Sequence, residues 1–274
     1  MKKVLAITGL IILILILALF VIMFPAVNAM SKTGVVDIDS GLKIFTGGGG
    51  NSAVYVTPDK GAIVIVDTKM GKWAKKLKAY TDSINPNAKV TVINTHAHGD
   101  HTGGNKLYPK ADFITGGYES SKPGALQGML IKVGETYTLK VPDDEIEIRN
   151  MGNAHSFADS IVYFKKRKLL MTGDLVFNGW HPVLMKLGGA DSDKWVKALD
   201  YLIKNYDVKT AVPGHGVVSG AKILMDQKAY FDDIKTALND PAKLKALKEK
   251  YKDYMHMPIF TGFDKTAAFI RNSK

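Results

Sequence analysis

The sequence predicts an α/β protein folded as an αββα sandwich of four layers. Each half of the chain is rich in short strand-like segments and ends in helical ones, an order that favours two sheets with helices outside them. Histidine and aspartate residues directly follow several of the strand-like segments, the place where α/β proteins build their sites. The length of 274 residues and the hydrophobic content of 46% suit one sizeable core.

The first half is expected to begin with short strands that end at Asp67. An amphipathic helix follows near residues 72–83, and the β-branched, apolar run at residues 89–94 predicts a buried strand. Residues 113–115 predict a further short strand. The segment 116–134 is rich in glycine, and we interpret it as a mobile lid or pocket wall.

The second half is expected to contain two pairs of strands. Residues 137–141 and 145–150 alternate as strands around a turn at Pro142, and residues 160–165 and 168–172 form a hairpin. The later elements are a helix at residues 192–206 capped by Asp191 or Ser192, a strand at 209–212, and helices at about 220–238 and 241–254.

The N-terminus predicts a separate targeting segment. Lys2 and Lys3 precede an almost unbroken apolar stretch at residues 4–24, which has the length and composition of a signal peptide or a membrane anchor. We therefore assign residues 1–29 to that segment and residues 30–274 to a folded domain with a C-terminal helical tail. The domain is expected to be exported, either to the periplasm or the extracellular space or anchored to the outer side of the cytoplasmic membrane.

The formal charge of +11 comes from a lysine-rich surface that is densest at residues 222–252. Such a surface attracts anionic substrates, headgroups or nucleic acid, but acidic residues interrupt this one, and no nucleic-acid-binding motif accompanies it. We interpret it as a solvated helix face and expect no nucleic-acid partner. The chain has no cysteine, which excludes a thiol mechanism and lipid attachment at cysteine.

Four potential metal ligands lie within six residues, 96–101, shortly after the strand at 89–94. His96, His98, Asp100 and His101 offer imidazole nitrogen and carboxylate oxygen, donors that suit Zn²⁺ and its first-row neighbours. His96 and His98 share one side of an extended segment, whereas the adjacent Asp100 and His101 point apart unless the chain bends. We therefore expect one pair of ligands for each of two metals.

Three further potential ligands stand at other strand ends, each beside small residues. His155, Asp174 and His215 follow the strand-like segments at 145–150, 168–172 and 209–212. A lone aspartate after a strand is usually a turn or a cap, and a lone histidine between glycines is usually a loop residue. The same placement of all three favours one common site.

In this order the motifs resemble those of the metallo-β-lactamase superfamily: H-x-H-x-D-H, a lone His, Gly-Asp, and Pro-Gly-His-Gly. The resemblance implies the αββα fold and a binuclear hydrolase. It implies two Zn²⁺ ions, although the ligand set also suits Fe or Mn. One ion would be held by His96, His98 and His155, and the other by Asp100, His101 and His215, with Asp174 as the bridge. Asp67 resembles the residue that supports this site from outside.

Asp174 places the resemblance nearer to glyoxalase II-like thioesterases and general exported hydrolases than to the zinc β-lactamases that have cysteine there. Zinc lowers the pKa of bound water to roughly 7, which makes hydroxide available at neutral pH. We assign Asp100 the catalytic role of orienting this nucleophile and carrying a proton to the leaving group.

The predicted activity is zinc-dependent hydrolysis of an ester, thioester or lactam bond in a small molecule. A phosphodiesterase or nuclease of the same fold and a non-catalytic metal-binding domain are the alternatives. The segment after Asp174 is expected to wall the substrate pocket with Phe177, Asn178, Trp180 and His181.

Overall fold

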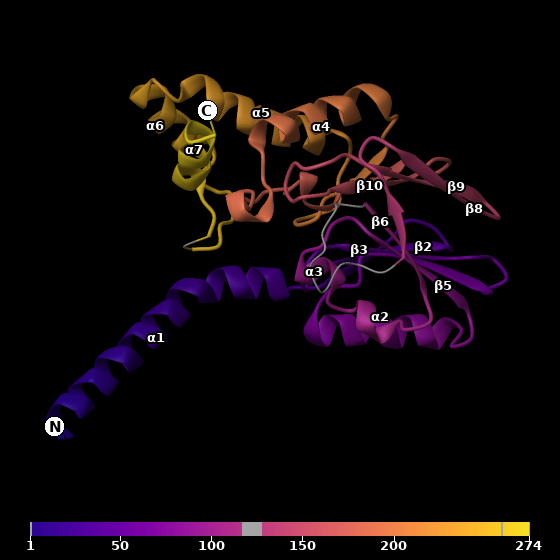
Figure 1. The fold of residues 1–274 in the computed structure, drawn as a ribbon, viewed down its shortest axis with the longest axis horizontal. Helices are drawn as coiled ribbons and strands as arrows, with labels where there is room; N and C mark the ends of the chain where they lie inside the picture. Colours follow the sequence, from indigo (N-terminus) through magenta and orange to yellow (C-terminus); the bar gives the residue numbers. More distant parts are fainter. Residues whose placement is uncertain (1, 117–127, 259, 274) are drawn as a thin grey trace.

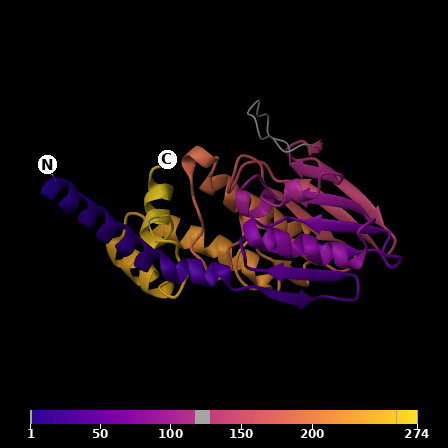
Figure 2. The same ribbon diagram turned by 90° about the horizontal axis from the view of Figure 1, so that it is seen from below.

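The computed structural model describes residues 2–116, 128–258 and 260–273, and it shows two β-sheets packed between helices (Figures 1 and 2). A seven-stranded sheet has the strand order β1-β2-β3-β4-β5-β6-β7, and a five-stranded sheet has the order β12-β11-β10-β9-β8. Helix α2 (Gly71–Ile84) lies below the first sheet in Figure 1, and α4 (Ser192–Asn205) and α5 (Lys222–Ala237) lie above the second. The predicted αββα sandwich is confirmed.

The first sheet changes direction at β4. Strands β1 to β4 are paired antiparallel, and β4 to β7 are paired parallel. Parallel strands place their carboxyl ends at one edge, so the residues after β4 and β5 emerge together. The bounds are β1 Gly34–Asp37, β2 Leu42–Thr46, β3 Ser52–Val56, β4 Ala62–Val66, β5 Lys89–Asn94, β6 Asp112–Gly116 and β7 Met129–Ile131.

The second sheet is antiparallel except for its last pair. Strands β8 to β11 are paired antiparallel, and β12 joins β11 in parallel. The turns after β11 and β12 therefore leave the sheet at the same edge. The bounds are β8 Thr136–Val141, β9 Asp144–Asn150, β10 Ser160–Phe164, β11 Leu169–Met171 and β12 Thr210–Val212.

Three apolar clusters hold the four layers together. The inner one joins the facing sides of the two sheets, for example through Ile44 and Phe164. A second packs α2 on the outer side of the first sheet through Leu77, and the third packs α4 and α5 on the second sheet through Trp195 and Phe231. Because these side chains are almost completely buried, the layers form a rigid frame for the loops between them.

The C-terminal helices differ in part from the expected ones. Asp191 caps α4 as predicted, because its side chain accepts hydrogen bonds from two backbone amides of the first turn. Helix α6 (Pro241–Lys250) ends four residues before the expected boundary. Helix α7 (Phe263–Arg271) was not predicted; a helix of nine residues is marginal alone and is stabilised here by burying one face in the third cluster.

Of the two interpretations of the segment 116–134, a mobile lid or a pocket wall, the mobile lid is wrong for its last part. Residues 129–131 form β7, an edge strand paired in parallel with β6. Edge pairing satisfies backbone groups that a free loop would expose to water. Residues 117–127, on which the rest of that interpretation falls, lie outside the described residues.

Helix α1 (Lys2–Ser31) extends away from the two sheets (Figure 1), and apolar side chains such as Leu15 and Phe20 are exposed along it. Among the described residues, no helix combines the length and apolar character that crossing a membrane requires.

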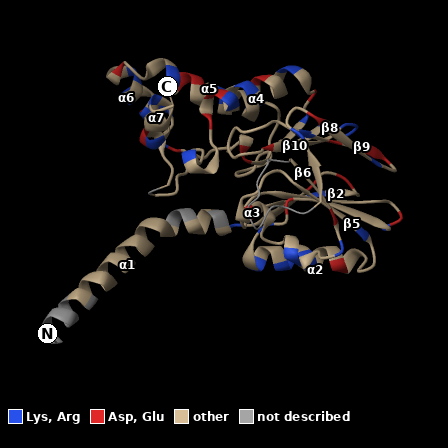
Figure 3. Cartoon of the chain, viewed as in Figure 1, with Lys and Arg blue, Asp and Glu red and all other residues tan. Residues whose placement is uncertain are grey.

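The basic residues of the helical layer alternate with acidic ones (Figure 3). Several form exposed ion pairs, including Lys222 with Asp226 and Lys250 with Asp233. Exposed pairs of this kind contribute little to stability, and the mixture of signs fits the expected solvated helix face.

Candidate metal centre

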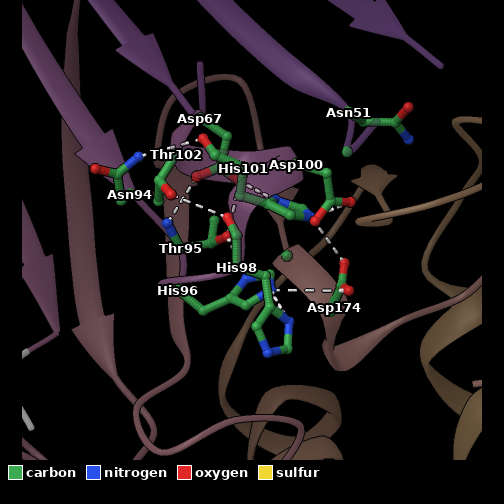
Figure 4. A network of polar contacts seen from close by, with 12 residues as sticks. Asn51, Asp67, Asn94, Thr95, His96, His98, Asp100, His101, Thr102 and Asp174 are labelled. Atoms are coloured by element: carbon green, nitrogen blue, oxygen red, sulfur yellow. Dashed lines mark hydrogen bonds and ion pairs between the residues drawn. The ribbon is translucent and has the colours of Figure 1, made fainter. Parts of the chain in front are cut away.

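The metal-ligand candidates of the first sheet come from the loop after β5. The chain is extended at His98 and then turns into the short helix α3 (Gly99–Thr102), which places Asp100 and His101 on a bent backbone. His96 and His98 precede this bend, and Asp100 and His101 lie within it. The bend therefore separates the four side chains into two pairs, as the spacing predicted (Figure 4).

The first ligand group consists of His96, His98, His155 and Asp174, whose ligand atoms lie within 4.8 Å of one another. His98 Nδ1 lies 3.0 Å from His96 Nε2 and 2.9 Å from His155 Nε2. His155 comes from the loop after β9, so this group joins loops of both sheets. Three imidazole nitrogens directed at one point are the donor set of a zinc site.

The Nδ1 atoms of His96 and His155 face away from the site, and their hydrogen bonds show which ring nitrogens are free to bind metal. The Thr95 hydroxyl donates its single proton to Asp67 at 2.7 Å, so it can only accept a hydrogen bond from His96 Nδ1, 3.1 Å away. His155 Nδ1 faces the Val183 carbonyl oxygen at 3.1 Å and must donate to it. Both rings therefore carry their proton on Nδ1 and direct a lone pair on Nε2 into the site.

The second ligand group consists of Asp100, His101 and His215. Asp100 Oδ2 lies 3.6 Å from His101 Nε2 and 3.2 Å from His215 Nε2. His215 comes from the loop after β12, so this group also joins both sheets. His101 is completely buried, whereas the Asp100 side chain retains 22% exposure. Asp100 is therefore the acidic ligand candidate that solvent or a substrate can reach.

Asp174 lies between the two groups (Figure 4). Its Oδ2 is 3.3 Å from His155 Nε2, and its Oδ1 is 3.1 Å from His101 Nε2 and 3.4 Å from His215 Nε2. Asp174 Oδ1 and His101 Nε2 are both buried without a hydrogen-bond partner among the described residues. Buried polar atoms are rarely left unpaired, and an ion at the second group would satisfy both of these. Because Asp174 Oδ2 faces the histidines of the first group, the residues also fit an ion there.

Asp67 connects this centre to β4. Its carboxylate accepts hydrogen bonds from the backbone amide and the hydroxyl of Thr95, and its Oδ2 lies 2.7 Å from His101 Nδ1. The His101 ring thereby keeps its proton on Nδ1 and its Nε2 toward the metal position. Asp67 adopts a φ of 58°, a left-handed backbone conformation that a non-glycine residue holds only when its surroundings fix it.

The charges in the centre depend on one another. Burial by itself would lower the pKa of His101, but Asp174, Asp100 and Asp67 raise this pKa well above its usual range. Burial and the neighbouring His101 lower the pKa of His96. Burial would raise the pKa of Asp174, yet the surrounding histidines lower it well below its usual range. The centre thus keeps its carboxylates ionised, which is the form that binds metal.

Lys69 and the loop 47–51 were not predicted to belong to this centre. The buried Lys69 Nζ donates to the carbonyl oxygens of Phe45, Gly47 and Gly50 at 2.7–2.9 Å. Burial lowers the pKa of Lys69 to about 7, although Asp67 and Asp100 oppose this shift. The Gly50 amide in turn donates to the Asp100 carbonyl oxygen at 3.2 Å.

Asn51 fastens the other end of that loop to the segment that carries His215. Its side-chain amide donates to the carbonyl oxygens of Pro213 and Gly216 at 2.8 and 2.9 Å. Gly50 allows this close packing, because a Cβ there would lie 2.2 Å from the His101 ring. A glycine-rich stretch followed by asparagine was the available signal in the sequence, but it does not show which loops it contacts.

A cavity of about 550 Å³ opens beside both ligand groups. Phe177, Trp180 and His181 line it, as expected of pocket residues. Asn178 lies outside this lining, with its side-chain amide bonded to the Val217 carbonyl oxygen, and its predicted contact with substrate stays a prediction. Met257 and Thr261, from the segment between α6 and α7, also line the cavity and were not predicted from the sequence.

The αββα sandwich carries two groups of histidine and aspartate residues in the loops at one edge of its sheets. This combination of fold and site is that of a class of metallohydrolases. The family model of the metallo-beta-lactamase superfamily matches residues 46–215, more than half of the chain. The protein therefore belongs to the metallo-beta-lactamase superfamily and is a metal-dependent hydrolase.

Similar proteins include two named metallo-beta-lactamase type 2. The protein from Elizabethkingia meningoseptica is 28% identical over 60% of this chain and 68% of its own length. The Bacillus cereus protein is 24% identical over 64% of this chain and 70% of its own. A solved metallo-beta-lactamase from Pontibacter korlensis matches 72% of this chain and 98% of its own with a TM-score of 0.61 at 22% identity, which supports the fold.

Proposed function

We propose that the protein is a zinc-dependent hydrolase that uses an activated water to cleave an ester, thioester or lactam bond. The observation that carries this proposal is the position of Asp174, whose two oxygens face separate ligand groups. His96, His98 and His155 would hold one ion, Asp100, His101 and His215 the other, and Asp174 both. Two bound ions would supply a nucleophile at neutral pH and polarise the scissile carbonyl group.

Asp100 is suited to a second role beside metal binding. Both aspartates line the cavity, but the Asp100 side chain keeps 22% exposure whereas that of Asp174 is almost completely buried. Burial by itself would raise its pKa, but His101 and His215 lower that pKa below the usual range, so the carboxylate stays ionised. Asp100 would orient the attacking water and pass its proton to the leaving group.

A substrate panel tests the reaction class. The zinc-loaded protein should hydrolyse at least one of a chromogenic cephalosporin, a thioester or a nitrophenyl ester, and the lactam is included because similar proteins are named for that activity. His96→Ala and His215→Ala should each lose turnover, and the exposed Met225→Gln is the matched control. Turnover of bis-p-nitrophenyl phosphate alone would overturn the proposed bond class in favour of a phosphodiesterase.

The N-terminal segment carries a second proposal, export of the domain. Lys2 and Lys3 before the apolar residues of α1 have the order of an export signal, in which the positive end stays inside. A reporter fused after Lys274 should be active only outside the cytoplasm, and replacement of both lysines by glutamate should reduce that activity. Full reporter activity inside the cytoplasm would contradict export.

A further inference from the structure

The walls of the cavity beside the metal centre are predominantly apolar. Met70 comes from the loop after β4, Phe177 and Trp180 follow Asp174, and Val183 and Met185 belong to the next turn. A final wall is Met257, held in place because its segment pairs with residues 179–181: the Met255 amide donates to the Gly179 carbonyl oxygen at 2.9 Å. Side chains from three separate segments thus place apolar surface beside the ligand groups.

The charged groups of the cavity are directed at the metal positions. Asp100 and Asp174 face the histidines, and no lysine or arginine is found among the described residues that line the cavity. The remaining polar ring, His181, is buried with Nδ1 2.7 Å from the Tyr230 hydroxyl. Burial and the neighbouring His256 lower the pKa of His181 to about 4, so this ring is neutral at pH 7.

We propose that this cavity selects uncharged substrates whose acyl group carries an apolar chain, and that Phe177, Trp180 and Met257 form the surface along which the chain lies. The proposal rests on the proposed hydrolase function and names its substrate class. A substrate carboxylate outside the reacting bond would lose hydration and find no lysine or arginine among the described residues of the lining, which is costly. An alkyl chain would exchange water for carbon contacts with the apolar walls of the cavity.

The volume is adequate for such a chain. Pockets for small molecules enclose roughly 300–1,000 Å³, and this cavity falls within that range. Burial of one methylene group is expected to improve binding about fourfold. For a series of nitrophenyl esters from acetate to octanoate, kcat/KM should therefore rise about fourfold per methylene until the cavity is full. Esters of the same length that end in a carboxylate should fall at least tenfold below their methyl-terminated partners.

Two substitutions test the assigned wall. Met257→Gln keeps the length of the side chain but adds a polar amide. It should make kcat/KM rise less steeply with the length of the acyl chain, with the largest loss of kcat/KM for octanoate. Met185→Lys adds a cation at the partly exposed rim and should improve the carboxylate-ended esters selectively. Met225→Gln, on the exposed face of α5, is the control and should preserve the wild-type dependence.

A binding measurement separates this proposal from the reaction itself. The metal-free protein is titrated with methyl ketones of increasing alkyl length, which cannot be hydrolysed, while tryptophan fluorescence is followed. Affinity should rise with chain length in the wild type and less steeply in Met257→Gln. If affinity rises but none of the panel substrates is cleaved, the hydrolase proposal fails and the apolar site stands. If esters are cleaved with no dependence on chain length, the proposed substrate class is overturned.

Discussion

The ammonium group of Lys69 donates to the carbonyl oxygen of Gly50 at 2.8 Å, and Gly50 lies against the ring of His101. This contact places a buried cation directly behind the second ligand group. Lys69 also donates to the carbonyl oxygens of Phe45, in β2, and of Gly47, so its loss would remove the donor from three buried or partly buried acceptors. The loop that supports Asp100 and His101 therefore depends on a residue that binds no metal itself.

The variant Lys69→Met should weaken the second ion and spare the first. It keeps most of the side-chain volume but removes the three donors, so the loop 47–51 is no longer fixed. Loss of such outer support typically reduces metal affinity about 10–100-fold. Competition for Zn²⁺ with a chromophoric chelator should show this loss in one of two binding steps, while Lys75→Met, an exposed residue of α2, should bind as the wild type does. Equal affinities in the two variants would remove Lys69 from this role.

The variant Asp100→Asn should separate metal binding from proton handling. The amide keeps one ligand oxygen and the size of the side chain but loses its basicity. With both metal positions filled, kcat should fall by roughly 10²–10⁴ for a substrate with a poor leaving group. The loss should be smaller when the leaving group needs no proton. Wild-type turnover by the metal-saturated variant on every substrate would refute the assignment.

His181 should make stability depend on pH between about 4 and 6.5. Its pKa is lowered in the folded protein to about 4, so the unfolded chain binds a proton first as the pH falls, and stability is lost through that window. With allowance for the part of the ring near water, the loss is about 2 kcal/mol. Urea unfolding of the metal-free protein gives the free energy of unfolding at pH 7 and at pH 4. The wild type should lose about 2 kcal/mol more between these two pH values than His181→Gln does. Parallel pH profiles of the two proteins would contradict it.

Arg167 should stabilise the frame without affecting the reaction. It bonds Asp144 at 2.9 Å, Asp143 at 2.7 Å and Asp39 at 2.6 Å, and so ties the β8–β9 turn to the turn between β1 and β2. Asp144 is fully buried, and Arg167→Met would leave its charge unpaired at a cost of about 3 kcal/mol. The denaturation midpoint should fall while kcat at 25 °C is retained; an unchanged midpoint would show that the network contributes nothing.

The sequence was sufficient for the layers and for the ligand candidates, because both depend on local patterns. His96 and His98 are two residues apart, so in an extended segment their side chains share one side. Asp174 and His215 follow short apolar strands, which their β-branched content identifies. The fold then brings these ends together through the parallel pairs β4–β5 and β11–β12.

The residues that the sequence did not reveal depend on contacts across long stretches of chain. Lys69 looks like any surface lysine until Phe45 and Gly50 are seen to surround it, and Asn51 finds its partners more than 160 positions later. Met257 reaches the cavity only because its segment pairs beside Trp180. Helix α7 is too short for its own propensity to determine it, and packing on α5 decides its place.

The most direct test of this account is the metal content of the purified protein after saturation with Zn²⁺ and removal of excess ion. The zinc content measured by mass spectrometry should approach two ions per chain, because Asp174 offers one oxygen to each ligand group. Asp174→Ala should lower the affinity of both positions, whereas Met225→Gln should retain two ions. A firm plateau at one ion per chain in the saturated wild-type protein would contradict the binuclear centre and the bridging role of Asp174.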